Sequence, residues 1–260
     1  MSINQCYIRS VNRSYGDQCG VARSLDVIGE RWALLIVREL LLGPKRFNDL
    51  LAGLAGASPN VISQRLRELT GSGVIRHRDL GPPARVRVYE LTDWGRELEP
   101  VILHLGQWGT RAPLPEGARS SLDSLILALQ ATADPAVVDG RYELRVDTDV
   151  FTVDGTSGSV RGRRGTADRP HAALTTDAGT LHAVALGRRP IADAVESGDL
   201  RLDGDPRAIS GLTRLLQALS GAGRPGDRRS RSVMNAPGLI EAADLPVIGD
   251  GTSSPVIRGF

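Results

Sequence analysis

The stretch SPNVISQRLREL, residues 58–69, holds both a helix start signal and two unlike helix faces. Ser58 is a favoured N-cap residue and Pro59 suits the first helical position, so the sequence predicts a helix from about residue 59 to residue 70 that stops at Gly71. One face is apolar at three- and four-residue steps, through Ile62, Leu66 and Leu69. The other face is polar, and its purpose decides how the chain is interpreted.

The segments that precede this helix are also predicted to be helical. Apolar residues recur at helical spacing in CGVARSLDVIGERWALLIVRELLLG, residues 19–43, and Gly29 is expected to divide this stretch into two helices. Gly43 and Pro44 end the second of them, and RFNDLLAGL, residues 46–54, predicts a shorter helix. A short turn, AGAS, then leads into the opening stretch.

The residues that follow predict a hairpin and one more helix. The segment RHRDLGPPARVRVY, residues 76–89, has strand character on both sides of a broad tip at Gly81-Pro82-Pro83-Ala84. Thr92 then caps a helix whose apolar stripe comprises Leu98, Val101, Ile102, Leu105 and Trp108. The predicted order is helix, turn, helix and hairpin, followed by a further helix.

The polar face of the helix at residues 58–69 has side chains that can read DNA bases. Asn60, Ser63, Gln64 and Arg67 fall within one surface arc at helical spacing. An α-helix fits the major groove of B-DNA, where asparagine, glutamine and arginine make bidentate contacts with purines. The alternative is a solvated face without a partner, because periodicity alone does not distinguish the two.

The local charge favours DNA as the partner of this face. Between residues 58 and 88 six arginines stand against two carboxylates, whereas the whole chain has a formal net charge of only +2. Arginines of the hairpin are expected to hold phosphates beside the groove, which orients a protein without reading sequence. The predicted DNA-contacting residues are Ser58, Asn60, Ser63, Gln64, Arg65, Arg67, Arg76, Arg78 and Arg85.

Three stretches carry a family resemblance: CGVARSLDVIGERWALLIVRELLLGPKRFNDL, SPNVISQRLRELTGSGVIRHR and VYELTDWGRELEPVILHLGQWG. Together they resemble the HxlR family of bacterial winged helix-turn-helix transcription regulators, over about residues 15–110. The resemblance implies a homodimer, paired through the N-terminal helices and the helix after the wing, on a roughly palindromic operator in double-stranded DNA. It also places Cys19 where several members have a cysteine that in some of them senses oxidants or electrophiles, and a helix N-terminus favours the reactive thiolate.

The second half of the chain has a different pattern. A helical segment, residues 118–131, precedes RYELRVDTDVFTVDGTSGSVRGRRG, residues 141–165, which alternates like antiparallel strands. Helix starts follow at Thr176-Asp177, Pro190 and Asp205-Pro206, with a short strand in DLRLDGD before the last.

This order of elements and the run LGRRPIADAVESGDLRLDGD resemble the sterol carrier protein 2 fold, over about residues 116–220. The resemblance implies an apolar tunnel for a hydrophobic small molecule, although such domains also serve as packing or dimerisation modules. Each candidate lining residue has ordinary core packing as its alternative. The candidates are Phe151, Val153, Leu181, Val184, Ile191 and Leu212.

The sequence therefore predicts an α+β protein, with a winged helix-turn-helix domain followed by an α+β domain that resembles sterol carrier protein 2. The expected parts are a flexible N-terminus, a DNA-binding domain, a ligand or regulatory domain, and a disordered or loosely packed tail. Their predicted ranges are 1–14, 15–112, 113–221 and 222–260.

The expected function is that of a cytoplasmic, homodimeric, sequence-specific DNA-binding regulator, controlled by a hydrophobic small molecule. The four histidines are dispersed and no catalytic motif is present, so no catalytic residue, metal site or cofactor is expected. No apolar stretch is long enough to span a membrane, and no membrane partner is expected. The alternatives are a lipid or small-ligand carrier whose N-terminal module serves dimerisation, and a redox regulator that acts through Cys19.

Overall fold

Helix α4, Pro59–Gly71, forms where the sequence predicted it. The hydroxyl of Ser58 accepts a hydrogen bond from the backbone N–H of Val61 at 3.4 Å, which satisfies one of the N-terminal donors that lack a helical partner. The apolar side chains of this helix, Ile62, Leu66 and Leu69, are buried. The predicted helix and its inward face are therefore confirmed.

The computed structural model describes residues 14–82, 85–113, 120–134, 138–156 and 158–222. Several predictions fall wholly or partly outside these residues. They concern the flexible N-terminus, the last part of the hairpin tip, the start of the second domain at residues 114–119, and the tail beyond Ala222.

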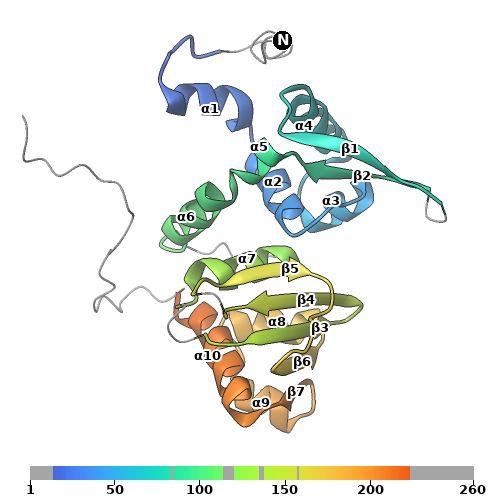
Figure 1. Cartoon of the computed structure of the whole chain (residues 1–260). Helices are drawn as coiled ribbons and strands as arrows, with labels where there is room; N and C mark the ends of the chain where they lie inside the picture. Colours follow the sequence, from blue (N-terminus) through green and yellow to red (C-terminus); the bar gives the residue numbers. More distant parts are fainter. Residues whose placement is uncertain (1–13, 83–84, 114–119, 135–137, 157, 223–260) are drawn as a thin grey trace, which may run out of the picture. The chain divides into compact units, whose positions relative to one another are not determined.

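Three helices precede α4 and a two-stranded hairpin follows it (Figure 1). Gly29 is the C-cap of α1, so the predicted division of residues 19–43 into two helices is confirmed. The remaining elements of this part are α1 Gly20–Ile28, α2 Ala33–Leu41, α3 Phe47–Gly53, β1 Ile75–Leu80 and β2 Val86–Leu91.

The hairpin, which we call the wing, is tied to the segment before α3. Strands β1 and β2 pair antiparallel, with Ile75 opposite Leu91 at the base and Leu80 opposite Val86 near the tip. Lys45 joins β2 near the base through an isolated backbone bridge, because it exchanges two hydrogen bonds of 3.0 and 2.8 Å with Tyr89. Backbone hydrogen bonds therefore join the entry of α3 to the wing.

The helix predicted after Thr92 is two helices, and the prediction of one was wrong. Thr92 caps α5, Asp93–Arg96, by accepting the N–H of Gly95 at 3.1 Å. A second helix, α6, Glu99–Gly109, starts afresh with Pro100 in its first turn, since a proline ring has no N–H for the preceding helix.

The apolar stripe predicted for this segment is divided, because Leu98 and Ile102 are partly buried against the core of the helix-turn-helix elements and the other three residues are exposed. None of the residues of α6 is buried, and Val101, Leu105 and Trp108 are exposed, Trp108 by 65%.

A mixed five-stranded sheet organises the rest of the described chain. Its strand order is β5-β4-β3-β6-β7, and β3 pairs parallel with β6, while the other neighbours are antiparallel. The antiparallel strands predicted over residues 141–165 are confirmed in β3, β4 and β5, and β6, which the sequence did not predict as a strand, adds the parallel pair. The bounds are α7 Leu122–Thr132, β3 Arg141–Val146, β4 Asp149–Asp154, β5 Arg161–Arg164, β6 Ala172–Thr176, α8 Ala178–Ala185, α9 Ile191–Glu196, β7 Leu200–Gly204 and α10 Pro206–Ala222.

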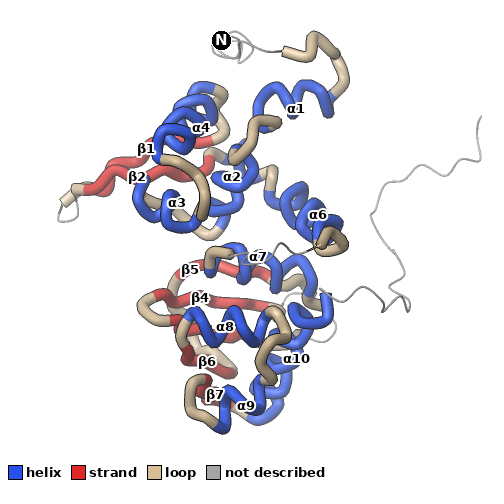
Figure 2. Tube along the Cα trace, turned by 180° about the vertical axis from the view of Figure 1, so that it is seen from behind, coloured by secondary structure: helices blue, strands red, loops and turns tan. Residues whose placement is uncertain are grey.

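Helix α8 covers one face of this sheet. It lies behind the strands in Figure 1 and in front of them in Figure 2, which is the view from the other side. The predicted helix start at Asp177 is confirmed, because its carboxylate accepts the N–H of Thr180 at 2.9 Å.

The residues predicted to line a tunnel belong to the core beside this sheet. Phe151, Val153, Leu181, Val184 and Leu212 are buried in one apolar cluster, and Ile191 packs against that cluster while partly exposed. Ordinary core packing, the alternative to a lining role, accounts for these positions. The tunnel stays a prediction.

A buried cluster of charges connects α7 with the helix-turn-helix elements, and all of them lie within one compact unit. The ammonium of Lys45 lies 2.6 Å from a carboxylate oxygen of Glu39, on α2, and 2.9 Å from one of Asp123, on α7. These three side chains are 7%, 0% and 2% exposed. Buried charges of this kind persist only when they are paired.

Further polar groups complete the cluster. Arg164, on β5, lies 2.5 Å from Asp123 and 2.5 Å from Asp149. The hydroxyl of Ser121, the N-cap of α7, donates to Glu39 at 2.6 Å. Burial alone raises the pKa of Asp123, but the hydrogen bond from Arg164 and the charge of Lys45 outweigh it, so this pKa lies below its ordinary value.

Replacing Asp123 with alanine removes the carboxylate that Lys45 and Arg164 share. We expect the free energy of unfolding in urea to fall by about 3–5 kcal/mol, the typical cost of leaving a buried charge unpaired. The stabilising contribution of Asp123 is present above its ordinary pKa and is lost as the pH falls through the lowered folded-state value. The wild type should therefore lose stability on acidification more steeply than the variant.

Asp79→Ala is the matched control, because Asp79 pairs with Arg87 where both side chains are exposed. Its effect should stay below about 1 kcal/mol. Equal losses of stability in the two variants would contradict the structural role assigned to the cluster.

Candidate nucleic-acid interface

The outward face of α4 presents a row of polar side chains. Asn60, Gln64 and Arg67 are exposed, and Ser63 between them is partly exposed. They lie on the side opposite the buried Ile62 and Leu66, as the spacing requires. The predicted separation into an inner apolar face and an outer polar face is therefore present in the structure.

Arg67 is the arginine of this face that is available for a partner. It is exposed and forms no ion pair with any residue that the structure describes. The side-chain amide of Gln64 donates to Glu68 at 3.1 Å, a contact within the same helix that an external acceptor can replace.

Arg65 lies differently from its neighbours. Its side chain is only 13% exposed, and its guanidinium pairs with Glu68 and, at 3.5 Å, with Glu30 from the connection between α1 and α2. Both carboxylates already compensate its charge. Arg65 is thus placed to hold α4 against the preceding segment, and its predicted contact with DNA would need those pairs to open.

The wing arginines share one carboxylate. Glu90 on β2 accepts from Arg76 at 2.8 Å and lies 3.2 Å from Arg78, both on β1. The Glu90 side chain is 5% exposed, whereas both guanidinium groups remain largely exposed. Glu90 therefore fixes the two arginines on the wing surface and offsets part of their charge.

The other wing arginines extend the basic surface towards the tip. Arg85 is exposed and has a positive φ of 40°, a conformation that non-glycine residues adopt mainly in turns. Arg87 pairs with Asp79 at 3.1 Å across the strands. Arg85 is placed by the turn into β2, with no carboxylate partner among the described residues.

Sequence reasoning missed the carboxylates that position these arginines. Glu68 lies three residues after Arg65, which is the spacing of a helical ion pair, and that signal was available in the sequence. The partnership of Arg76 with Glu90 depends on the strand register, in which these two residues are directly opposite. The sequence contains no signal for the pairing of Glu30 with Arg65, because this contact depends on tertiary packing.

Ser58 and Cys19 both begin helices. Ser58 is exposed, and its hydroxyl accepts the N-cap hydrogen bond of α4 from the N–H of Val61. Cys19 is exposed at the N-cap of α1, and the nearby backbone N–H groups of Val21 and Ala22 lower the pKa of its thiol. A redox role for Cys19 stays a prediction.

None of the described helices combines the length and apolar character needed to cross a bilayer. Within the same residues, no three histidine, cysteine, aspartate or glutamate side chains gather as metal ligands would.

Comparison with known proteins identifies the family to which the N-terminal part of the chain is similar. The model of the HxlR-like helix-turn-helix family matches residues 27–115. The HTH-type transcriptional regulator YvaP of Bacillus subtilis is 40% identical over 89 residues, which cover 34% of this chain and 82% of YvaP. YdeP of the same species is 38% identical over 112 residues, 41% of this chain and 87% of YdeP. Among solved structures, the redox regulator HypR in its oxidised form is 30% identical, with a TM-score of 0.35, over 37% of this chain and 100% of HypR.

The polar outer face of α4, the helices behind it and the arginine-bearing wing define a winged helix-turn-helix protein. The chain belongs to the HxlR family of helix-turn-helix proteins, and its curated relatives are transcriptional regulators. It is therefore a transcriptional regulator, and DNA is the partner that the family implies.

Replacing Glu90 with glutamine should strengthen binding to unselected DNA. The substitution keeps the shape of the side chain but removes the charge that Arg76 and Arg78 share. We expect the plot of log affinity against log salt to steepen by about 0.9, the equivalent of one further phosphate contact. Fluorescence anisotropy over a salt series measures this slope.

Asp79→Asn changes the net charge by the same amount and serves as the control, since its exposed pair with Arg87 offsets little charge. Identical slopes in the two variants would show that net charge alone matters and that Glu90 does not restrain the wing arginines.

Proposed function

We propose that this protein is a homodimeric regulator that recognises a specific DNA operator by placing α4 in the major groove. The observation that carries the proposal is the division of α4, whose Ile62, Leu66 and Leu69 are buried while Asn60, Gln64 and Arg67 face outward. Asparagine and glutamine recognise adenine, and arginine recognises guanine, through paired hydrogen bonds on the base edges of that groove.

The wing supports this assignment through the sugar-phosphate backbone. Arg76, Arg78 and Arg85 present guanidinium groups on the surface of the hairpin. Contacts of this kind fix the register of a protein on the duplex and supply affinity that depends on salt, without reading bases. The proposed division of labour is base reading by α4 and backbone contact by the wing.

Exposed apolar side chains support the proposed homodimer. Val101, Leu105 and Trp108 recur at helical spacing along α6, and Val21 and Leu25 do so on α1. Groups of large exposed apolar residues mark interaction surfaces in soluble proteins. A symmetric dimer built on these helices would present two copies of α4 to a roughly palindromic operator.

We further propose that the part beyond α6 is a regulatory domain, with the ranges predicted above. Its described elements follow the order on which the resemblance to sterol carrier protein 2 rests: a helix, strands, two helices, a short strand and a last helix. The buried pair of Asp123 with Lys45 gives such a domain a physical connection to the entry of α3. A hydrophobic ligand that shifts α7 would act on DNA binding through this pair.

The operator can be isolated by selecting DNA from a random pool with the full-length protein. Arg67→Ala should lower the affinity for the selected sequence at least about fivefold, with little change for unselected DNA, because a base contact is lost. Arg163→Ala is the matched control, since Arg163 is an exposed arginine of β5, and it should leave both affinities unchanged.

Two results would count against base reading. Failure of the wild type to enrich any sequence would remove the proposed function altogether. Equal weakening of selected and unselected DNA by Arg67→Ala would make Arg67 a phosphate contact. A lipophilic molecule that co-purifies with a protein lacking any operator would favour the carrier alternative.

Leu105→Lys should convert the dimer to a monomer, because a charge would enter the proposed apolar interface. Sedimentation velocity measures the change, and operator affinity should fall in parallel. Val195→Lys on α9 introduces the same charge at another exposed apolar residue and should leave the dimer intact. A wild-type protein that sediments as a monomer would remove this part of the proposal.

A further inference from the structure

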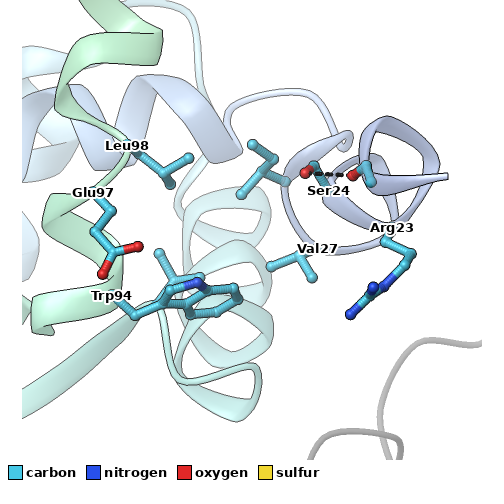
Figure 3. Close-up of a pocket in the computed structure, with 9 residues that line it drawn as sticks. Arg23, Ser24, Val27, Trp94, Glu97 and Leu98 are labelled. Atoms are coloured by element: carbon cyan, nitrogen blue, oxygen red, sulfur yellow. Dashed lines mark hydrogen bonds between the residues drawn. The ribbon is translucent and has the colours of Figure 1, made fainter. Parts of the chain in front are cut away.

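A cavity of about 350 Å³ lies between α1 and the start of α5–α6 (Figure 3). Its lining residues are Gly20, Arg23, Ser24, Val27, Ile28, Val74, Trp94, Glu97 and Leu98. The volume falls within the range of small-molecule sites in proteins, about 300–1,000 Å³. No part of the proposed DNA-reading face contributes to it.

The cavity exists because the inner face of α1 has small side chains. Gly20, Ser24 and Val27 recur at three- and four-residue steps, so they share one side of α1, and all three line the cavity together with Trp94. A side chain at Gly20 would meet no atom within 4 Å, which confirms open space there. The hydroxyl of Ser24 donates a hydrogen bond to the carbonyl of Gly20 at 2.8 Å, so this donor needs no partner inside the cavity.

The walls are suited to a flat, largely apolar molecule. Val27, Ile28, Val74 and Leu98 contribute aliphatic surface, and the indole of Trp94 adds an aromatic wall that is 42% exposed. An aromatic ring beside an exposed indole removes apolar area of both from water and gains a stacking or edge contact.

Two opposite charges mark the ends of this lining. In Figure 3 Glu97 and Arg23 stand on opposite sides, with Trp94 and Val27 between them. Neither forms an ion pair with a described residue, and both are exposed. A guanidinium favours a carboxylate, and a carboxylate favours an ammonium group.

We propose that this cavity binds a small aromatic molecule whose ring packs between α1 and Trp94, with an acidic group towards Arg23 and a basic group towards Glu97. The site is separate from the candidate tunnel beside the five-stranded sheet, and it does not depend on the DNA-binding proposal. Its chemical class is an aromatic zwitterion with its charges on opposite sides of the ring.

A matched series of probes tests both the cavity and its charges by calorimetric titration of the full chain. The probes are para-(aminomethyl)benzoate, para-toluate, which lacks the ammonium group, and para-methylbenzylamine, which lacks the carboxylate. The zwitterion should bind the wild type about fivefold more tightly than either relative, the upper range for exposed charge pairs. Glu97→Gln should abolish its advantage over para-toluate, and Arg23→Gln its advantage over para-methylbenzylamine.

Filling the cavity gives the decisive control. Ser24→Leu should abolish binding of para-(aminomethyl)benzoate by occupying the space. Ser210→Leu should retain binding, since Ser210 is an exposed helical serine whose hydroxyl likewise bonds the carbonyl four residues earlier, that of Pro206. Thermal unfolding of both variants checks that they remain folded.

Three results would overturn the proposal. They are no binding of any probe to the wild type, undiminished binding to Ser24→Leu, and binding that appears only when Leu105→Lys disrupts the dimer. The last would mean that a second copy of the chain fills the cavity.

Discussion

The burial of one apolar stripe on α4 fixes what this protein shows to a partner. Ile62, Leu66 and Leu69 pack into the core formed with α2 and the base of the wing, and each contributes roughly 1.5–3 kcal/mol by leaving water. Rotating the helix would expose them and bury amide and guanidinium groups that have no partners there. The outward position of Asn60 and Arg67 is thus a consequence of packing on the other side of the same helix.

A second constraint acts at Lys45, in the segment between α2 and α3. Lys45 pairs its backbone with Tyr89 of the wing and its ammonium with Glu39 and Asp123, so a single residue joins the wing, α2 and α7. Glycine at position 53 belongs to the same arrangement, because a side chain there would begin 2.5 Å from a carboxylate oxygen of Glu39. The elements around α4 are held both by apolar packing and by paired charges.

The sequence predicted what local rules control and missed what long-range packing controls. Ser58 and Pro59 are enough to place the start of α4, because caps and proline act within one turn, whereas the helix includes the predicted stop Gly71 and has its C-cap at Ser72. Lys45 and Asp123 are 78 positions apart in the sequence, and no periodic pattern of residues predicts their pairing. The inward turn of Arg65 towards Glu30, the parallel pairing of β3 with β6 and the cavity facing Trp94 likewise depend on neighbours distant in the chain.

Methylation of bound operator DNA by dimethyl sulfate tests the central claim most directly. This reagent modifies N7 of guanine, which faces the major groove, and N3 of adenine, which faces the minor groove. Two clusters of protected guanine N7 atoms about one helical turn apart are the predicted result, one for each α4 of a dimer. Protection confined to adenine N3, or uniform reactivity along the operator, would contradict the placement of α4 in the major groove.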